Sequence, residues 1–235
     1  MYKYETHLHT YPVSRCARAS VREVLEFYKS LGYDGVFITN HFLDGNINID
    51  AELSYEEKIN FYCSDWEEGK AIAEEIGIKA FFGIEMSYKG TDFLVYGLDK
   101  EWLLKNPQIM EMKKSEEMQY LISEGAFVVQ AHPYREARYI DHIRLFPRCV
   151  QGVEIINASR TEAENAMAAH YAKSYGLIDF AGSDNHTGAK QTSLAGMCCE
   201  RAIVDEKDFI DAVRSGEMKP FVLDLSTVKD YAKER

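Results

Sequence analysis

The 235-residue sequence has no long apolar run, little proline and a shortage of positive charge. No stretch approaches the roughly 20 apolar residues that a helix needs to cross a bilayer, so we expect no membrane association. The first residues do not show a charged segment followed by an apolar one, which is the pattern of a secretory signal. The chain has only 27 basic residues but 38 acidic ones. The resulting net charge of −11 argues against a nucleic-acid partner.

Cysteine is scarce as well, since the chain has five, an odd number without the spacing of a disulfide framework. This usage is typical of a reducing compartment, so we expect a cytoplasmic protein. No linker rich in proline, serine or glycine divides the chain, and 46% of its residues are hydrophobic, enough for a substantial core. We therefore expect a single domain over residues 1–235, of unspecified oligomeric state.

Strand-like and helix-like patterns alternate along the chain. Ser20 and Glu23 form a capping box before an apolar stripe of helical period, and glycines follow several helical stretches. The pattern predicts helices over 20–31, 55–76, 111–123, 161–175 and 205–215. It predicts strands over 2–7, 35–39, 80–84, 93–96, 127–131, 153–156, 178–181 and 221–223.

This alternation indicates an α/β fold with a largely parallel sheet. About seven strand-and-helix units in this length favour a closed barrel over a doubly wound open sheet, although periodicity alone does not separate the two. The positions of the polar residues support the barrel, because barrel enzymes take their catalytic residues from the carboxyl ends of many strands.

Residues able to bind metal ions follow five successive strands of this pattern. The first strand ends with His7 and His9, and both imidazoles face one side because alternate residues of a strand point the same way. The candidates at the ends of the later strands are His41, Glu85, His132, Asp184 and His186. We expect all of these side chains to converge on one cleft.

Each candidate also has an ordinary structural interpretation. A single strand-end histidine is usually just hydrogen-bonded, and Asp184 would serve equally as a helix N-cap. Five such coincidences at one end of the strands are less probable than one multinuclear site. His142 and His170 fall in helical stretches and are expected to be non-ligands. Imidazole and carboxylate ligands suit Zn, Mn or Fe, and Glu85 would bridge two ions that share a hydroxide.

At this point the sequence resembles the PHP (polymerase and histidinol phosphatase) family over about residues 4–190. The motifs that carry the resemblance are His7-Leu8-His9, His41 after an apolar strand, Gly83-Ile84-Glu85, Ala131-His132-Pro133 and Ser183-Asp184-Asn185-His186. The resemblance implies a distorted (β/α)7 TIM-like barrel with a cleft for two or three metal ions at the carboxyl ends of its strands. It also implies hydrolysis of phosphoesters.

The resemblance further implies which residues hold the first two ions. The first ion would take His7, His9, Glu85 and Asp184. The second would take Glu85 and His132, and many members add a histidine between these two motifs. Here Asp92 aligns with that place, and a carboxylate can replace the imidazole. The alternative is that Asp92 only caps a turn after Gly90-Thr91.

A third ion would be held by His41 and His186. Members usually supply another Asp, Glu or His shortly after the first motif, but the segment 10–15 contains none, so the resemblance leaves the third ion open. Asn40 stands where many members have Asp, so the orientation of neighbouring ligands is expected to differ. Cys16 lies near the expected mouth of the site, close to metal.

Arginines follow several of the same strand ends and are suited to bidentate contact with phosphate. The candidates for substrate binding are Arg15, Arg18, Arg135 and Arg160, with Lys190 as a weaker one. Each is otherwise an ordinary solvated side chain.

The expected function is hydrolysis of a small phosphorylated metabolite, histidinol-phosphatase-like, by a hydroxide that bridges two ions. Glu85 would be catalytic through the ions, and Asp184 or His186 would move protons near the leaving group. The alternatives are hydrolysis of a C–N or C–O bond, nuclease-type phosphodiester cleavage, which the acidic balance disfavours, and a metal-binding module without catalysis.

Overall fold

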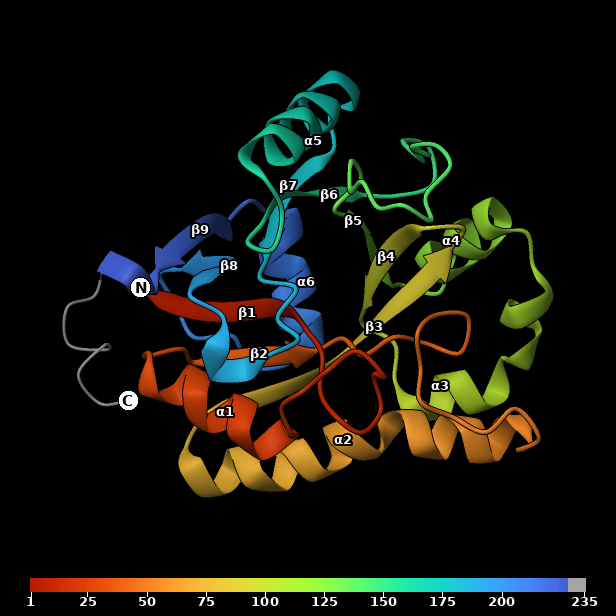
Figure 1. Cartoon of the computed structure of the whole chain (residues 1–235), viewed down its shortest axis with the longest axis horizontal. Helices are drawn as coiled ribbons and strands as arrows, with labels where there is room; N and C mark the ends of the chain where they lie inside the picture. The colour runs from red at the N-terminus through yellow and green to blue at the C-terminus, as the bar shows by residue number, and fades with distance from the viewer. Residues whose placement is uncertain (228–235) are drawn as a thin grey trace.

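A nine-stranded sheet forms the centre of the molecule and curls into a nearly closed barrel (Figure 1). The computed structural model describes residues 1–227. The strands follow one another across the sheet in the order β7-β6-β5-β4-β3-β2-β1-β8-β9. Their bounds are β1 Tyr2–Leu8, β2 Gly35–Ile38, β3 Lys79–Tyr88, β4 Thr91–Tyr96, β5 Phe127–Ala131, β6 Gly152–Asn157, β7 Ile178–Gly182, β8 Ser193–Cys199 and β9 Lys219–Asp224.

The barrel closes at the end of β1. The backbone N–H of His9 donates to the Asn185 carbonyl at 2.9 Å, and the N–H of Asn185 donates to the His7 carbonyl at 3.3 Å. The segment that follows β7 therefore lies against β1, although β7 stands at the far end of the strand order. Residues near the beginning of the chain and near position 185 thus share one end of the barrel.

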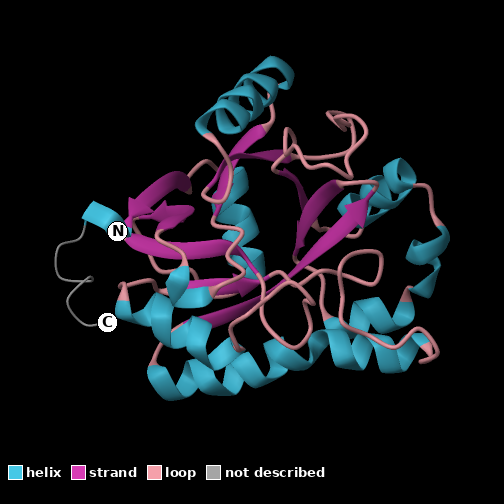
Figure 2. Cartoon of the chain, in the orientation of Figure 1, coloured by secondary structure: helices cyan, strands magenta, loops and turns pink. Residues whose placement is uncertain are grey.

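Six α-helices surround this sheet in the described part of the chain (Figure 2). They are α1 Val21–Ser30, α2 Tyr55–Ile76, α3 Lys100–Lys105, α4 Lys114–Ser123, α5 Glu162–Tyr175 and α6 Glu206–Arg214, with 3-10 turns η1 Pro107–Glu111, η2 Gly188–Lys190 and η3 Leu225–Thr227. The expected capping box of Ser20 and Glu23 is present, and similar boxes begin α2 and α5. No helix among the described residues is long and apolar enough to span a membrane.

The expectation of a largely parallel sheet is wrong for half of the strand pairs. β1/β2, β2/β3, β5/β6 and β6/β7 are parallel, whereas β3/β4, β4/β5, β1/β8 and β8/β9 are antiparallel. The reversal at β4 arises because Lys89 and Gly90, with φ of 51° and 83°, form a tight turn that leaves no room for a crossover helix. The count of a (β/α)7 barrel is therefore not confirmed, although the barrel is.

Three further expectations about elements differ from the structure. Residues 111–113 precede α4 rather than belonging to it, and α3 and β8 were not expected. His142 lies in the helix-free segment between β5 and β6, so its expected helix is wrong, whereas His170 lies in α5. Residues 228–235 of the expected single domain lie outside the described part of the chain.

The interior of the barrel is filled with aromatic side chains at the end opposite to the strand-end histidines. Phe209 of α6 is fully buried and its ring centroid lies 4.5 Å from that of Phe37 and 5.8 Å from that of Tyr96. α6 therefore closes this end of the barrel. The other end is left to polar side chains.

Candidate metal centre

The strands bring all of the predicted metal ligands to the open end of the barrel. His7 lies in β1, His9 follows directly after it, and Asp92 comes from β4. Glu85 lies in the middle of the long strand β3, so its expected place after the end of a strand over 80–84 is wrong. The loops after β2, β5 and β7 supply His41, His132, Asp184 and His186. Every one of these side chains is buried except that of His186, which is 26% exposed at the rim.

The Glu85 carboxylate lies at the centre of the cluster. Its Oε1 lies 3.1 Å from His7 Nε2 and 3.4 Å from His132 Nε2. Its Oε2 lies 2.7 Å from His41 Nδ1 and 3.4 Å from His9 Nε2. One carboxylate thus reaches four imidazoles, two with each oxygen, which is the arrangement a bridging ligand requires.

The candidate ligands form three overlapping groups whose donor atoms lie within 4.8 Å of one another. The groups are His7/His9/Asp184, His7/Glu85/His132 and His9/His41/His186. They differ in detail from the expected assignment, because His7 is shared by two groups and His9 joins His41 and His186. Asp92 belongs to none of them.

The chemistry of these donors fits divalent ions. Both ring nitrogens of His132, Glu85 Oε2 and His41 Nδ1 are buried without a properly oriented hydrogen bond. Buried polar atoms rarely lack a hydrogen-bond partner. Several such nitrogen and oxygen atoms around one small space therefore indicate that they are ligands of an ion. Mixed imidazole and carboxylate ligands suit Zn, Mn or Fe.

Two of the candidate ligands have an unusual backbone. His132 has a φ of 26° and Asp184 a φ of 52°, in the left-handed region that side chains other than glycine rarely adopt. His132 comes directly after β5, and Asp184 is the second residue after β7. The turn they make there directs the side chain back over the barrel mouth, and such strain is commonly kept at functional sites.

Glu154, which the sequence analysis missed, orients two of the ligands. Its Oε1 accepts from His7 Nδ1 at 2.9 Å, and its Oε2 accepts from the His132 backbone N–H at 3.0 Å. With the proton on Nδ1, His7 presents the lone pair of Nε2 to Glu85 and Asp184. The available signal was a carboxylate within the otherwise uncharged strand β6, Gly-Val-Glu-Ile-Ile-Asn.

Replacing Glu154 by Gln should lower metal affinity roughly 10- to 100-fold, the usual cost of losing a partner that orients a ligand. Gln keeps the size but loses the charge that fixes the His7 tautomer. Titration of the metal-free variant with Zn²⁺ measures the effect. Equal affinity in the variant and the unmodified protein would show that Glu154 has only a packing role.

A second chain of hydrogen bonds orients His9. Asp65 Oδ2 accepts from Asn40 Nδ2 at 3.2 Å, and Asn40 Oδ1 accepts from Ser14 Oγ at 2.8 Å. The hydroxyl proton of Ser14 is thus engaged with Asn40. In the 3.1 Å hydrogen bond between His9 Nδ1 and Ser14 Oγ, the imidazole N–H is therefore the donor. His9 therefore also presents Nε2 to the cluster. Asn40, which was expected to alter the orientation of neighbouring ligands, links Ser14 to Asp65 in this series of hydrogen bonds.

The electrostatic field differs across the site. Burial lowers the pKa of His7, but the carboxylates of Glu154, Asp184 and Glu85 outweigh it and raise that pKa well above its usual value. At His9, burial and the neighbouring His186 and His41 lower the pKa well below it. Negative charge is thus concentrated around His7, and imidazoles gather around His9.

The Asp92 carboxylate lies close to two side chains, those of Arg135 and His132. Its Oδ2 lies 2.8 Å from Arg135 Nη2 and 3.8 Å from His132 Nε2. It lies within β4 opposite Ser87, on the other arm of the Lys89-Gly90 turn, and its side chain hydrogen-bonds with Ser87. The interpretation as a turn residue therefore stays open, the ion pair with Arg135 adds to it, and coordination of an ion by Asp92 stays a prediction.

If Asp92 is a ligand, Asp92→Ala should lower the occupancy of one ion and leave the ion of His7 and His9 in place. The physical reason is the loss of an anionic oxygen next to His132 only. Elemental analysis of the purified variant measures the change. Unchanged stoichiometry and activity would assign Asp92 to the ion pair with Arg135 alone.

The four candidate arginines are not equivalent. Arg135 lies at the rim of the cleft, where its guanidinium contacts Asp92. Arg18 turns its guanidinium toward the backbone carbonyls of Arg15 and Ala17, at 3.4 Å each. Arg15, Arg18 and Arg160 do not line the cleft, and neither does Lys190. Their predicted contact with substrate stays untested.

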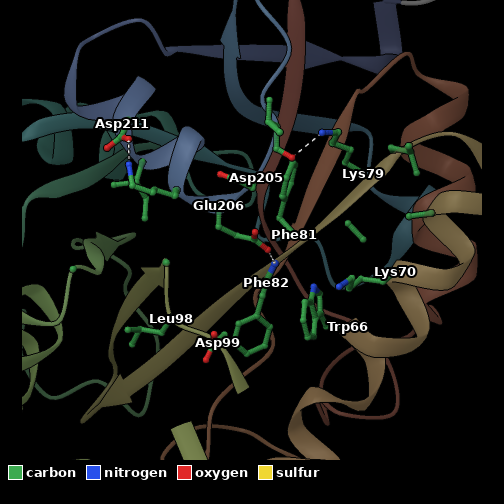
Figure 3. Close-up of a pocket in the computed structure, with 18 of the residues that line it drawn as sticks. Trp66, Lys70, Lys79, Phe81, Phe82, Leu98, Asp99, Asp205, Glu206 and Asp211 are labelled. Atoms are coloured by element: carbon green, nitrogen blue, oxygen red, sulfur yellow. Dashed lines mark hydrogen bonds and ion pairs between the residues drawn. The ribbon is translucent and has the colours of Figure 1, made fainter. Parts of the chain in front are cut away.

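The cleft has a volume of about 540 Å³ and is lined by His41, Glu85, Asp92, Asp184 and His186 together with Arg135 and Cys16. A larger cavity of about 870 Å³ lies at the other end of the barrel, between α2, β3 and α6 (Figure 3). No histidine or cysteine lines it, and its Glu206 accepts a hydrogen bond from the Phe82 backbone at 2.9 Å. That carboxylate accepts from a backbone N–H inside β3 and supplies no site.

Cys16 lies within the cleft, next to the third group of imidazoles. Burial opposes ionisation of its thiol, but hydrogen bonds with His186 and His41 outweigh it and lower the pKa to about 6. The other four cysteines are buried elsewhere. A cysteine is thus part of this polar site, as its position in the sequence indicated.

Comparison with known proteins supports the fold. No family model and no curated protein matches the sequence. The chain is similar to a two-domain protein from Bacteroides vulgatus that contains a predicted PHP-like metal-dependent phosphoesterase, with 13% identity and a TM-score of 0.67 over 94% of this chain. It spans 64% of that protein.

Two further solved structures share this architecture at 13% identity each. A protein from Bifidobacterium adolescentis assigned as a metal-dependent phosphoesterase matches 89% of this chain and 95% of its own, with a TM-score of 0.56. An amidohydrolase from Chromobacterium violaceum, with bound sulfate and no metal, matches 97% of this chain and 99% of its own, with a TM-score of 0.55. The α/β barrel that the motifs implied is confirmed, and these neighbours share its fold.

Proposed function

We propose that this chain hydrolyses a phosphoester of a small metabolite with the help of two or three divalent ions, Zn, Mn or Fe. The observation that carries the proposal is the position of Glu85, whose two oxygens lie within 3.4 Å of four imidazoles. The three groups of donors around it have the ligand types of hydrolytic metal centres. The PHP-like fold of its structural neighbours agrees with this assignment.

The protein supplies the geometry of the reaction. When bound, the ions would activate water and neutralise the oxygens of the phosphate. Glu85 would hold two of them together, and Glu154 and Ser14 fix the imidazoles that hold them. Arg135 lies at the rim, where a guanidinium can bind a phosphate oxygen.

Asp184 and His186 are placed to manage protons. His186 Nδ1 lies 3.0 Å from the Asp184 carbonyl and 3.3 Å from its Oδ1, and the ring also hydrogen-bonds with the Cys16 thiol. Its partial exposure at the rim lets it exchange a proton with a leaving oxygen and with solvent. In the form with two ions, in which no ion occupies the group of His9, His41 and His186, we assign His186 the general-acid role and Asp184 the role of holding it.

A second candidate is hydrolysis of a C–N or C–O bond. The fold shared with the Chromobacterium violaceum amidohydrolase favours it, because the same ligands can polarise a carbonyl. The sulfate bound to that neighbour has the shape of phosphate, so its structure is compatible with both reactions. Substrate tests must separate them.

The test is a panel of phosphomonoesters, phosphodiesters, amides and lactones, assayed with protein loaded separately with Zn²⁺, Mn²⁺ or Fe²⁺. We expect turnover of at least one small phosphomonoester and competitive inhibition by inorganic phosphate. Turnover confined to amides or lactones would establish the second candidate. No turnover of any class in protein that has bound metal would support the metal-binding module.

Arg135→Met should raise the KM for the phosphomonoester roughly 10-fold and change kcat less, since a hydrogen bond to a charged group contributes about 1.5–3 kcal/mol. Arg148→Met is the matched control, because Arg148 is exposed and does not line the cleft. Steady-state kinetics of both variants measure the effect. An unchanged KM in the Arg135 variant would remove this residue from substrate binding.

A further inference from the structure

The group formed by His9, His41 and His186 is the least complete of the three. It consists of imidazoles alone, whereas each of the other two groups contains a carboxylate of its own. The nearest carboxylate oxygens, Glu85 Oε2 and Asp184 Oδ1, belong to the other two groups, so this group has no anionic ligand of its own. Structural and catalytic ion sites normally include an anionic ligand or an open position for water.

The loop that carries Cys16 forms backbone hydrogen bonds with the loop after β2 and with the loop after β7, which carry His41 and His186. The Arg15 backbone N–H donates to the Asn46 carbonyl at 3.0 Å, in the loop that follows His41. The Arg18 N–H donates to the His186 carbonyl at 2.8 Å. The two residues between these anchors, Cys16 and Ala17, are therefore held beside the segments that carry His41 and His186.

The thiol itself meets those imidazoles. The Cys16 thiol interacts with both His41 and His186 and lines the same cleft. Its sulfur is not among the donor atoms of this group that lie within 4.8 Å of one another, so binding of an ion would draw the thiol inward. An independent observation points to a missing ion there. His41 Nδ1 is buried, and it contacts Glu85 Oε2 at 2.7 Å without the geometry of a hydrogen bond.

We propose that Cys16 is a thiolate ligand of an ion held by His9, His41 and His186. Coordination replaces the S–H bond by a bond from sulfur to the ion, and the proton passes to solvent. A soft sulfur ligand selects Zn or Fe over Mn at this position. The inference rests on the proposed metal centre and adds to it a fourth ligand and a preference for the metal.

Cobalt substitution tests the sulfur ligand without reference to activity. Metal-free protein is loaded with Co²⁺, and its stoichiometry and absorption spectrum are recorded for the unmodified chain, Cys16→Ser and Cys149→Ser. We expect a near-ultraviolet thiolate-to-cobalt charge-transfer band in the unmodified chain and in the Cys149 control. Cys16→Ser should lose the band and bind about one ion less per chain, because its hydroxyl stays protonated.

Alkylation of the unmodified protein gives a second measurement that needs no variant. Cys16 is the only partly exposed cysteine, since the other four are buried. Iodoacetamide followed by peptide mass mapping should label Cys16 in metal-free protein and leave it unlabelled after Zn²⁺ is added.

The outcomes separate this inference from the proposed function. Cobalt binding at full stoichiometry without a charge-transfer band, or labelling of Cys16 that Zn²⁺ does not slow, would overturn the sulfur ligand and leave the other ions in place. Failure to bind cobalt at all would overturn both proposals.

Discussion

Glu85→Gln should cause the largest loss of activity of any single substitution in this protein. We expect kcat/KM to fall at least roughly 10³-fold, because partners that merely orient a ligand already contribute about 10- to 100-fold. The amide keeps the shape of the side chain but loses the charge that two ions would share. Metal content should fall together with activity, since the imidazoles of His7, His41 and His132 would lose their common neighbour.

A buried carboxylate outside the site provides the control for Glu85. Glu117 is as well buried and lies 2.6 Å from Lys114 Nζ, so Glu117→Gln tests the general cost of losing a buried charge. Elemental analysis and steady-state kinetics are run on both variants. A Glu85 variant that keeps its full metal content, or a Glu117 variant that loses as much, would contradict the bridging role.

The second large effect concerns stability. Phe209→Ala should lower the free energy of unfolding by about 3–5 kcal/mol, the usual cost of truncating a fully buried aromatic side chain. For a chain of this size that loss corresponds to a decrease in Tm of roughly 6–20 °C. The reason is the position of Phe209, whose ring packs between those of Phe37, Tyr96 and Phe180 where α6 closes the barrel.

Differential scanning calorimetry of the variant measures this change. Val222→Ala in β9 is the control, because that side chain is 55% exposed and should shift the Tm little. If the two variants melt alike, α6 does not close the barrel in the way the packing indicates. The metal content of the Phe209 variant should be preserved, since the aromatic cluster and the ion site occupy opposite ends.

The location of the site was predictable because strand ends are visible in the sequence. His41 and His132 each follow an apolar run of strand length, and His7 ends an alternating stretch. The carboxyl ends of the strands of a barrel meet at one end, so these positions alone predict that the three side chains converge. The bounds of α2 were also predictable, since a capping box at Ser54 begins the helix and Gly77, with a φ of 73°, ends it.

Strand direction and long-range partners were not predictable in the same way. An apolar run has the same composition in either direction, so the reversal of β4 depends on the turn at Lys89 and Gly90 rather than on the strand itself. β8 was missed because Ser-Leu-Ala-Gly-Met-Cys-Cys has no β-branched residue; it is a strand because β1 and β9 pair with it. The role of Glu154 depends on a contact 147 residues away.

The closure of the barrel at β1 also determines when during synthesis this chain can first hold an ion. His7 is made well before its carboxylate neighbours, which are Glu85, Glu154 and Asp184. The backbone contact that closes the barrel involves Asn185. A nascent chain therefore carries an incomplete set of ligands until His186 has left the ribosome, and tight binding of an ion reports a closed barrel.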